Sequence, residues 1–297
     1  MKWAGIALLV VVLATAVVLR VLGMDAALWH AWKLNGRAMP ETALNLGRYR
    51  VDIDARVIEG IADDLSALSY NPERNTLFGI LNGEPMLVEL SLEGQLLRQV
   101  FIEGVVDMEG LSHVSGNRFV IAEERSQRLL ILDIPDGVDR VDASQARSLR
   151  IGLDDPGNKG FEGVTWDHVS NRLLVVNERD PLRVLAVEGF VDDDLDQRMS
   201  LSISDYRQAG GSLPLRDLSS LVLDEQTGHL LLLSDESRMV MEFDAENRPI
   251  SVLGLWWGMA GLSANVPQAE GMALDSQRRL YIVSEPNLFY RFTPTGD

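Results

Sequence analysis

The chain repeats one arrangement of apolar runs five times, and this repeat constrains the fold more than any other feature of the sequence. In each copy a first apolar run is followed by a turn cluster such as Asn-Pro, Ser-Asn or Thr-Gly, and then by a second apolar run. Such clusters close tight hairpins. The first runs align without gaps and begin at Asp64, Asp107, Gly160, Asp217 and Gln268. Each copy is therefore expected to open as a β-hairpin.

A third and a fourth apolar run complete each of the first four copies, which recur at roughly 43 to 57 residues. Four strands per repeat at this period are typical of β-propeller blades. The fifth copy has only three runs, but residues 43–54 alternate like a strand and precede the first copy. We expect this segment to add the missing outer strand, which would leave no free edge between the first and last blades. The sequence thus predicts an all-β fold, a five-bladed propeller over residues 43–297.

An apolar segment precedes the propeller. Residues 3–24 would extend roughly 30 Å as a helix, which is enough to cross a bilayer if Arg20 reaches the interface. We therefore interpret residues 1–24 as a single transmembrane anchor and residues 25–42 as a linker, where Trp29 and Trp32 suit a membrane interface. A cleaved signal peptide is the alternative, because residues 14–16 have the small-x-small form, although they lie inside the apolar run.

The basic residues around this segment give conflicting indications of orientation. Lys2 favours a cytoplasmic N-terminus. The basic residues on the other flank argue the reverse, and they are Arg20, Lys33, Arg37, Arg48 and Arg50. The charge count alone is therefore against a propeller outside the cytoplasm.

Composition excludes several classes of function. The chain carries 44 acidic against 27 basic residues, a net charge of −17, whereas a nucleic-acid partner requires a basic face. It has no cysteine, which removes disulfides, thiolate catalysis and zinc-finger sites. The four histidines are scattered, and neither HExxH nor GxSxG occurs, so zinc hydrolases and serine triads are poorly supported.

The repeat also aligns two columns of polar residues. In a propeller the innermost strand starts at one face of the ring and the second strand returns to that face, so both columns should meet at one mouth of the central channel. The first column is Ser66, Glu109, Glu162, Ser219 and Glu270. The second column is Asn82, Glu124, Glu178, Asp235 and Glu285.

Carboxylates packed around one channel mouth repel one another unless they are protonated, paired or bridged by a cation. A hard divalent ion with oxygen ligands fits this arrangement, Ca²⁺ before Mg²⁺, which takes fewer protein ligands. The candidate metal ligands are Glu109, Glu162, Glu270, Glu124, Glu178, Asp235 and Glu285. Because serine replaces glutamate at Ser66 and Ser219, we expect any ion to lie off the axis, toward the blades of Glu109, Glu162 and Glu270.

A purely structural interpretation of these acids stays open. Arg125, Arg179 and Arg238 closely follow acids of the second column, which could therefore form ion pairs between blades. In the first column each glutamate is followed by glycine, which permits close backbone approach beside an inward-facing acid and favours ligation.

Three segments resemble the SdiA-regulated, YjiK-like family of bacterial proteins: NKGFEGVTWD from Asn158, RDLSSLVLDEQTGHLLLLSDES from Arg216 and QAEGMALD from Gln268. The resemblance extends over nearly everything after about Arg48. It implies a five-bladed propeller related to NHL repeats, a bound calcium ion, and an N-terminal membrane segment with the propeller outside the cytoplasm. It implies no substrate.

Two functions follow from these observations. The first is a binding or scaffold module, anchored in the inner membrane by a single pass with its propeller in the periplasm, that binds calcium at the channel mouth and an unidentified protein or small molecule. The alternative is a calcium-dependent hydrolase of the lactonase or esterase type, in which the ion polarises a carbonyl oxygen and a mouth carboxylate acts as base.

Overall fold

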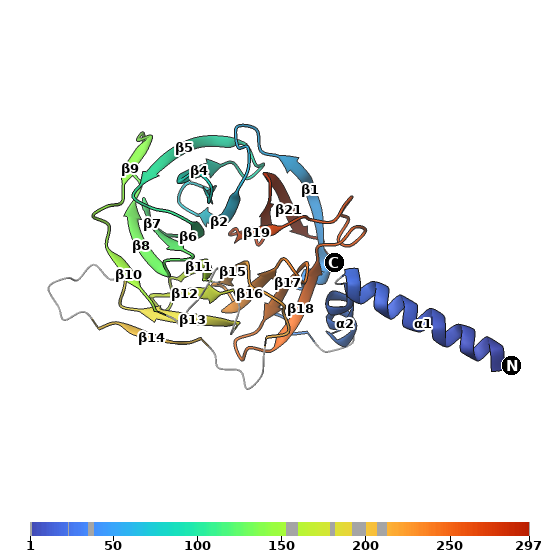
Figure 1. The fold of residues 1–297 in the computed structure, drawn as a ribbon. Coiled ribbons are helices and arrows are strands. Elements are labelled where there is room, and N and C mark those ends of the chain that lie inside the picture. The colour runs from blue at the N-terminus through green and yellow to red at the C-terminus, as the bar shows by residue number, and fades with distance from the viewer. Residues whose placement is uncertain are drawn as a thin grey trace.

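The computed structural model describes residues 2–22, 24–34, 39–152, 160–178, 182–191, 200–206 and 213–296. Within them, five β-sheets stand around a central channel like the blades of a propeller (Figure 1). Each blade begins with its innermost strand and adds strands outward in chain order, apart from the closing strand of the fifth. The five-bladed, all-β propeller predicted from the repeat is confirmed.

The strands match the predicted apolar runs. Blade 1 contains β2 (Leu65–Asn71), β3 (Thr76–Leu81), β4 (Met86–Leu90) and β5 (Leu96–Glu103). Blade 2 contains β6 (Met108–Ser115), β7 (Arg118–Glu123), β8 (Arg128–Asp133) and β10 (Ser148–Arg150). Blade 3 contains β11 (Phe161–Asp167), β12 (Arg172–Asn177), β13 (Arg183–Glu188) and β14 (Ser202–Asp205). Blade 4 contains β15 (Ser220–Asp224), β16 (His229–Ser234), β17 (Met239–Phe243) and β18 (Pro249–Gly254).

Blade 5 closes the ring with a strand from the other end of the chain. Its inner strands are β19 (Ala269–Leu274), β20 (Leu280–Ser284) and β21 (Leu288–Pro294). The outer strand is β1 (Tyr49–Val57), which pairs antiparallel with β21. The predicted closing strand began at residue 43, but a short 3-10 helix, η1 (Leu46–Arg48), delays its start. The predicted mode of closure is nevertheless confirmed.

One strand was not predicted. β9 (Arg140–Asp142) lies in the long connection between β8 and β10 of blade 2, yet it pairs parallel with β5 on the outer edge of blade 1. This pairing covers an edge that would otherwise expose unpaired backbone groups, and it ties blades 1 and 2 together on their outer side.

The core lies between the blades. Five apolar clusters of buried side chains each fill the space between two neighbouring sheets, so that every blade shares its two faces with its neighbours. Leu174 and Leu173, adjacent on β12, accordingly belong to the clusters on opposite faces of blade 3. Burying one such side chain contributes about 1.5–3 kcal/mol, so blade contacts supply most of the stability.

Two helices precede the propeller. α1 (Lys2–Leu22) extends away from the ring and α2 (Met24–Leu34) lies beside β18 (Figure 1). α2 begins at the last residue of the segment that we interpreted as an anchor, and the rest of it lies in residues 25–42, which we interpreted as a linker. Leu34 of α2 is buried, and Met24 packs against the cluster between blades 3 and 4. Although a helix forms where the sequence predicted a transmembrane segment, none of the described helices combines the length and the apolar character that a membrane crossing requires.

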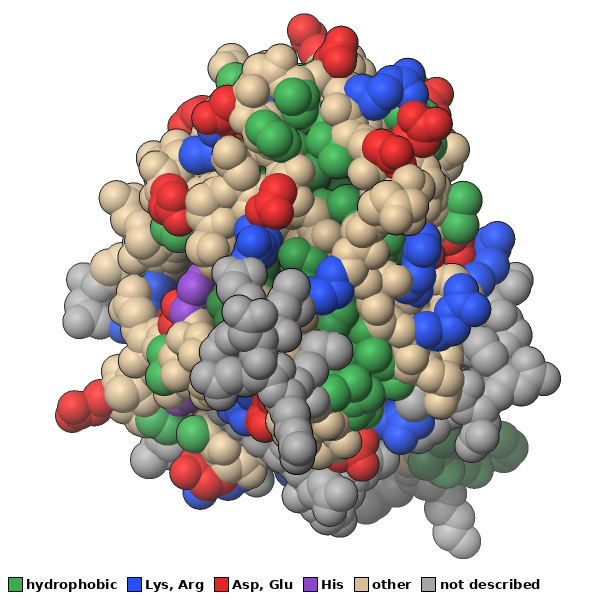
Figure 2. Space-filling view, turned by 90° about the vertical axis from the view of Figure 1, so that its left-hand side faces the viewer, with side chains coloured by type: hydrophobic (Ala, Val, Ile, Leu, Met, Phe, Trp, Pro, Cys, Tyr) green, Lys and Arg blue, Asp and Glu red, His purple; other side chains and the backbone are tan. Residues whose placement is uncertain are grey.

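The outer side of the ring mixes charges of both signs. Figure 2 shows Lys and Arg side chains interspersed with Asp and Glu on the side toward the left of Figure 1, with hydrophobic side chains between them. Ion pairs between neighbouring strands, such as Arg118 on β7 with Asp133 on β8 at 3.4 Å, also bring opposite charges together. Clustered acids are instead found where the inner strands begin.

Candidate functional site at the acidic channel mouth

The first column of polar residues occupies β-bulges. In blade 2, Met108 pairs with Glu123 and Gly110 with Ala122, so Glu109 has no residue opposite it. The same break in register falls at Ser66, Glu162 and Glu270. A bulge removes a residue from the regular pairing and redirects its side chain, and bulges are common beside functional sites. Four of the five first-column residues therefore lie at bulges and have no partner residue on the second strand of their blade.

The second column follows the second strand of each blade and lies at the same end of the ring. The backbone N–H of Glu124 donates to the carbonyl of Asp107 at 3.0 Å, and that of Glu285 donates to the carbonyl of Gln268 at 3.1 Å. Asn82 and Glu178 make the equivalent bonds to Asp64 and Gly160. These bonds join the start of the inner strand to the end of the second strand, so the two columns meet as the sequence predicted.

Five of the seven predicted ligands fall into compact acidic groups. Among the described residues, Asp107, Glu109 and Glu124 offer ligand atoms within 4.8 Å of one another, and so do Glu124, Glu162 and Glu178. Glu124 belongs to both groups and therefore links the acids of blade 2 with those of blade 3. Oxygens bound to one Ca²⁺ at about 2.3–2.6 Å lie at most about 5 Å apart, so either group has suitable spacing for one ion.

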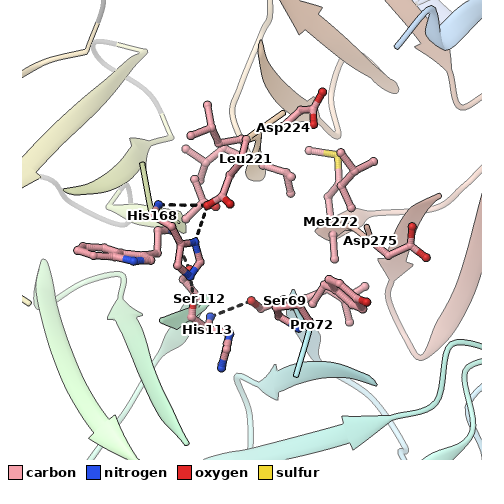
Figure 3. Close-up of a pocket in the computed structure, with 18 of the residues that line it drawn as sticks. Ser69, Pro72, Ser112, His113, His168, Leu221, Asp224, Met272 and Asp275 are labelled. Atoms are coloured by element: carbon pink, nitrogen blue, oxygen red, sulfur yellow. Dashed lines mark hydrogen bonds and ion pairs between the residues drawn. The ribbon is translucent and has the colours of Figure 1, made fainter. Parts of the chain in front are cut away.

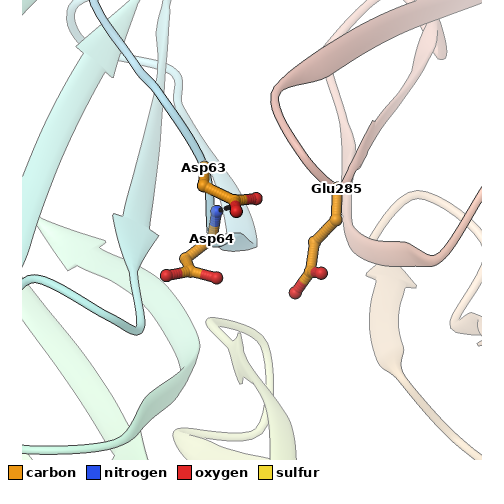
Figure 4. A group of neighbouring side chains, drawn as sticks. All are labelled: Asp63, Asp64 and Glu285. Atoms are coloured by element: carbon orange, nitrogen blue, oxygen red, sulfur yellow. Dashed lines mark hydrogen bonds between the residues drawn. The ribbon is translucent and has the colours of Figure 1, made fainter.

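A third group lies at the seam between blades 5 and 1. Asp63, Asp64 and Glu285 offer ligand atoms within 4.8 Å of one another, and Figure 4 shows their side chains reaching toward the gap between the two blades. Glu270 and Asp235 belong to none of the three groups. The ion position that we expected toward Glu109, Glu162 and Glu270 stays a prediction. Of these three acids, Glu109 and Glu162 fall into groups that share Glu124, and Glu270 falls into none.

Burial and mutual repulsion disfavour the ionised form of these acids. Burial first, and then the charges of Glu270 and Glu124, raise the pKa of Glu109 to about 8. Burial followed by the charge of Asp107 raises the pKa of Glu124 to about 7. Burial, again followed by neighbouring carboxylates, raises the pKa of Glu162 well above its ordinary value.

The acids of blade 5 belong to the same electrostatic unit. Burial, then the charges of Asp235 and Glu285, raise the pKa of Glu270 to about 8. Because the charge of Glu270 on blade 5 raises the pKa of Glu109 on blade 2, the charge state of one blade depends on the others. A bound cation would lower all these pKa values together.

The basic residues near this mouth are engaged with other groups. Arg125 lies 3.4 Å from a carboxylate oxygen of Asp107 in its own blade, and its charge also acts on the neighbouring Glu124, whose pKa it lowers in part. Arg238 donates to the carbonyl of Val266 at 3.1 Å and stacks over the ring of Trp256. Arg179 lies outside the described residues. The contacts of Arg125 and Arg238 thus give little support to inter-blade ion pairs as the role of the second column.

The glycines that follow the first-column glutamates have a different role from the one we inferred. A Cβ on Gly110 would lie 3.1 Å from the backbone nitrogen of Val164 in the next blade, and one on Gly271 would lie 2.7 Å from the carbonyl carbon of Ala67. These glycines therefore allow neighbouring inner strands to approach closely around the channel. Their presence explains the packing of the ring and is no argument for metal ligation.

Sequence reasoning missed a third polar column. Asp64, Asp107 and Asp217 each stand two residues before the first-column position, at the first residue of their aligned copies. Asp217 is buried and accepts hydrogen bonds from the backbone of Glu236 and from the Ser234 hydroxyl. The alignment contained this signal, because three of its five copies begin with aspartate. Asp63 lies outside the aligned copies and gave no such signal.

The mouth has room for more than bare ions. A hollow of about 560 Å³ is lined by Glu162, Glu178, Asp235 and Glu270, among others. A second, of about 680 Å³, lies between blades 1 and 2 beside Asp107, Asn82 and Arg125. Metal-bound water or a polar group of a ligand could enter either hollow from solvent.

Comparison with known proteins identifies the family. A model of the family described as SdiA-regulated matches residues 41–293. The chain belongs to the SdiA-regulated family. This confirms the resemblance seen in the three sequence segments, and the match covers the whole ring of blades. Membership of this family agrees with the β-propeller fold and does not identify a ligand.

Two solved structures are similar in part. The β-propeller domain of Cps50 (Swd1) from Myceliophteria thermophila aligns at 13% identity with a TM-score of 0.42, over 78% of this chain and 65%, under two thirds, of that chain. A nidogen/laminin complex aligns at 14% identity with a TM-score of 0.48, over 75% of this chain and 73% of that chain. At such identities and scores the two structures add nothing to the functional argument.

Proposed function

We propose that this SdiA-regulated propeller binds Ca²⁺ at its acidic channel mouth and uses that face as a binding module at the cell envelope. The observation that carries the proposal is the position of Glu124, whose carboxylate belongs to two groups of three acids with calcium-like spacing. Every donor in these groups is a carboxylate oxygen, the ligand type that hard divalent cations take.

Protonation is the competing way to relieve repulsion among these acids. With the pKa of Glu124 raised to about 7, a proton and a cation compete for the same oxygens near neutral pH. Binding of Ca²⁺ should therefore release protons and tighten as the pH rises from 6 to 8. The resemblance to a family associated with calcium favours Ca²⁺ over other divalent ions.

A calcium titration tests the proposal. We expect the full-length protein, stripped with chelator, to release heat on titration with CaCl₂. Its thermal stability should also rise, and the folded state should gain about 3 kcal/mol at a hundredfold excess of Ca²⁺ over Kd. Glu124→Gln should remove most of this response. Asp133→Asn is the matched control, because Asp133 is an exposed acid at the end of β8 that pairs with Arg118 and belongs to none of the three acidic groups. Absence of any response up to millimolar CaCl₂ would contradict the proposal.

In the hydrolase alternative, no histidine of the described residues is placed to act as the general base at the acidic mouth. His113 and His168 line a cavity at the other end of the inner strands, so a mouth carboxylate would have to accept the proton. A panel of ester and lactone substrates, run with Glu162→Gln and Glu270→Gln, separates the two functions. Activity that disappears in both folded variants would establish the enzyme, whereas calcium binding without turnover supports the binding module.

We also propose that residues 1–24 attach the propeller to the inner membrane, with the propeller in the periplasm. The support is the exposure of large apolar side chains on α1, including Trp3, Leu9, Val11 and Val17, each more than half exposed. Trp29 and Trp32 of α2 are exposed as well, with ring centroids 5.3 Å apart. Membrane fractionation tests attachment, and protease accessibility of the propeller in spheroplasts tests its side.

A further inference from the structure

A ring of apolar side chains lies one layer inside the acidic mouth. Each blade contributes one residue, two positions after its first-column residue, and none is more than 4% exposed: Leu68, Leu111, Val164, Leu221 and Met272. We call these five side chains the apolar ring. All five line a separate cavity, of about 250 Å³, at the end of the channel opposite the acids. The apolar ring thus separates two compartments of different chemistry.

Most polar side chains around this cavity already form ion pairs or hydrogen bonds with other groups of the protein. Figure 3 shows the carboxylates of Asp224 and Asp275 turned away from the cavity, and they pair with Arg278 at 2.9 Å and Arg279 at 2.6 Å. The hydroxyl of Ser69 accepts the backbone N–H of His113 at 2.9 Å, and this bond joins blades 1 and 2. The interior that remains is mainly apolar, with Leu221 and Met272 pointing into it (Figure 3).

One charged pair stands at the rim. Nδ1 and the backbone N–H of His168 both approach the same oxygen of Glu225, Oε1, at 2.5 and 3.1 Å. Nε2 of His168 lies 2.7 Å from the carbonyl of Val114. Because both ring nitrogens face acceptors, these contacts favour the protonated form of His168, and the contact with Nδ1 positions the Glu225 carboxylate between blades 3 and 4. Both contacts with His168 use Oε1 of Glu225. The other carboxylate oxygen, Oε2, is therefore the one that can accept a hydrogen bond from a ligand.

We propose that this cavity is a second binding site, for a small ring compound that carries one hydroxyl or N–H donor. Ligand sites typically combine apolar walls with a few fixed polar groups, and an apolar cavity of about 150 Å³ already accommodates benzene in another protein. The apolar ring would contact the body of the compound while Oε2 of Glu225 accepts its donor. The site stands independently of calcium, because none of the three acidic groups contributes a residue to it.

Fluorinated probes test the site. We expect ¹⁹F NMR of 4-fluorophenol to show saturable binding to the full-length protein, and 4-fluoroanisole, which lacks the donor, to bind about tenfold more weakly. Met272→Trp and Val222→Trp, which fill the cavity from different blades, should each abolish saturation. The full-length protein is kept in detergent for this experiment, and the same two variants measure how much of each probe partitions into the detergent. Glu225→Gln should weaken 4-fluorophenol about tenfold and leave 4-fluoroanisole unchanged.

The acidic-mouth variant Glu124→Gln should bind 4-fluorophenol as the wild type does, which separates this site from the proposed calcium site. Wild-type protein without saturable binding, or saturation that survives in both folded tryptophan variants, would overturn the site. Equal affinity for the phenol and the anisole would overturn the role of Glu225.

Discussion

The backbone N–H of Leu44 donates to Oε1 of Glu242 at 2.8 Å, across 198 residues of chain. Glu242 lies on β17 and is completely buried. Its carboxylate also accepts the Ser251 hydroxyl at 2.5 Å and lies 2.8 Å from Nδ1 of His229. Ser251 in turn accepts the N–H of Leu46 at 3.0 Å. Blade 4 therefore fixes the segment that delivers the closing strand β1 to blade 5.

Removal of this carboxylate should weaken ring closure. Glu242→Ala leaves three buried donors without an acceptor, and we expect a loss of about 3–5 kcal/mol in the free energy of unfolding. Glu246→Ala is the control, because Glu246 is 66% exposed and its pair with Arg248 should contribute less than about 1 kcal/mol. Denaturant titration measures the free energy of unfolding of both variants. Similar losses in the two variants would show that the hydrogen bonds of Glu242 do not stabilise the closing segment.

The acidic mouth should make the metal-free protein less stable as the pH rises. Glu109 and Glu270 keep their protons in the folded protein up to a pH of about 8, whereas in the unfolded chain they ionise near 4.5. Between these values the folded state binds more protons, so its stability falls with increasing pH. We expect thermal melts in chelator to show lower Tm at pH 8 than at pH 5.5, and saturating CaCl₂ to reduce the difference.

Neutralising one of these acids should have the opposite effect from an ordinary destabilising substitution. Glu109→Gln is expected to raise the metal-free stability at pH 8 by at least about 1 kcal/mol, since one pKa unit corresponds to about 1.4 kcal/mol. In the presence of Ca²⁺ the same variant should lose stability relative to wild type. Glu103→Gln, at a side chain 60% exposed on β5, should change neither. A Glu109→Gln protein that is less stable in chelator would contradict the electrostatic argument.

The repeat predicted the blades and the meeting of the two columns because strand pairing in a propeller follows from hairpin length and apolar alternation. It could not predict which acids group together. Glu124 and Glu178 lie on different blades, and their proximity depends on how closely the inner strands pack around the channel. The glycines show the same limit, since Gly110 faces the backbone of the next blade, a contact that no single copy of the repeat encodes. β9 was missed because its residues, Arg140–Asp142, include a single apolar side chain, Val141, and its partner strand β5 belongs to another copy of the repeat.

His168 should contribute stability that depends on pH. Its hydrogen bond to Glu225 raises its pKa above 6.5, so the contribution is fully present below pH 6.5 and is lost as the pH rises through the folded-state pKa. Because the side chain is 43% exposed, we expect His168→Gln to cost less than about 1 kcal/mol at pH 6 and still less at pH 9. Val169→Ala, at the neighbouring exposed position, should be neutral at both. Melts at the two pH values check this, and an equal loss at pH 9 would show that packing rather than charge is responsible.

Gly271→Ala should damage the seam between the last and first blades. An added Cβ would lie 2.7 Å from the carbonyl carbon of Ala67, 2.8 Å from the backbone nitrogen of Leu68 and 2.6 Å from Cγ2 of Val283. The two backbone atoms cannot move without shifting β2, so we expect a loss of about 1–3 kcal/mol in the free energy of unfolding. Gly152→Ala is the control, because a Cβ there meets nothing within 4 Å. Denaturant titration compares the two, and a Gly271→Ala protein as stable as the control would show that β2 can shift to accept the added Cβ without loss of packing between blades 5 and 1. Calcium binding supplies a second readout: weaker binding in Gly271→Ala would show that close packing of the inner strands also positions the acids at the mouth.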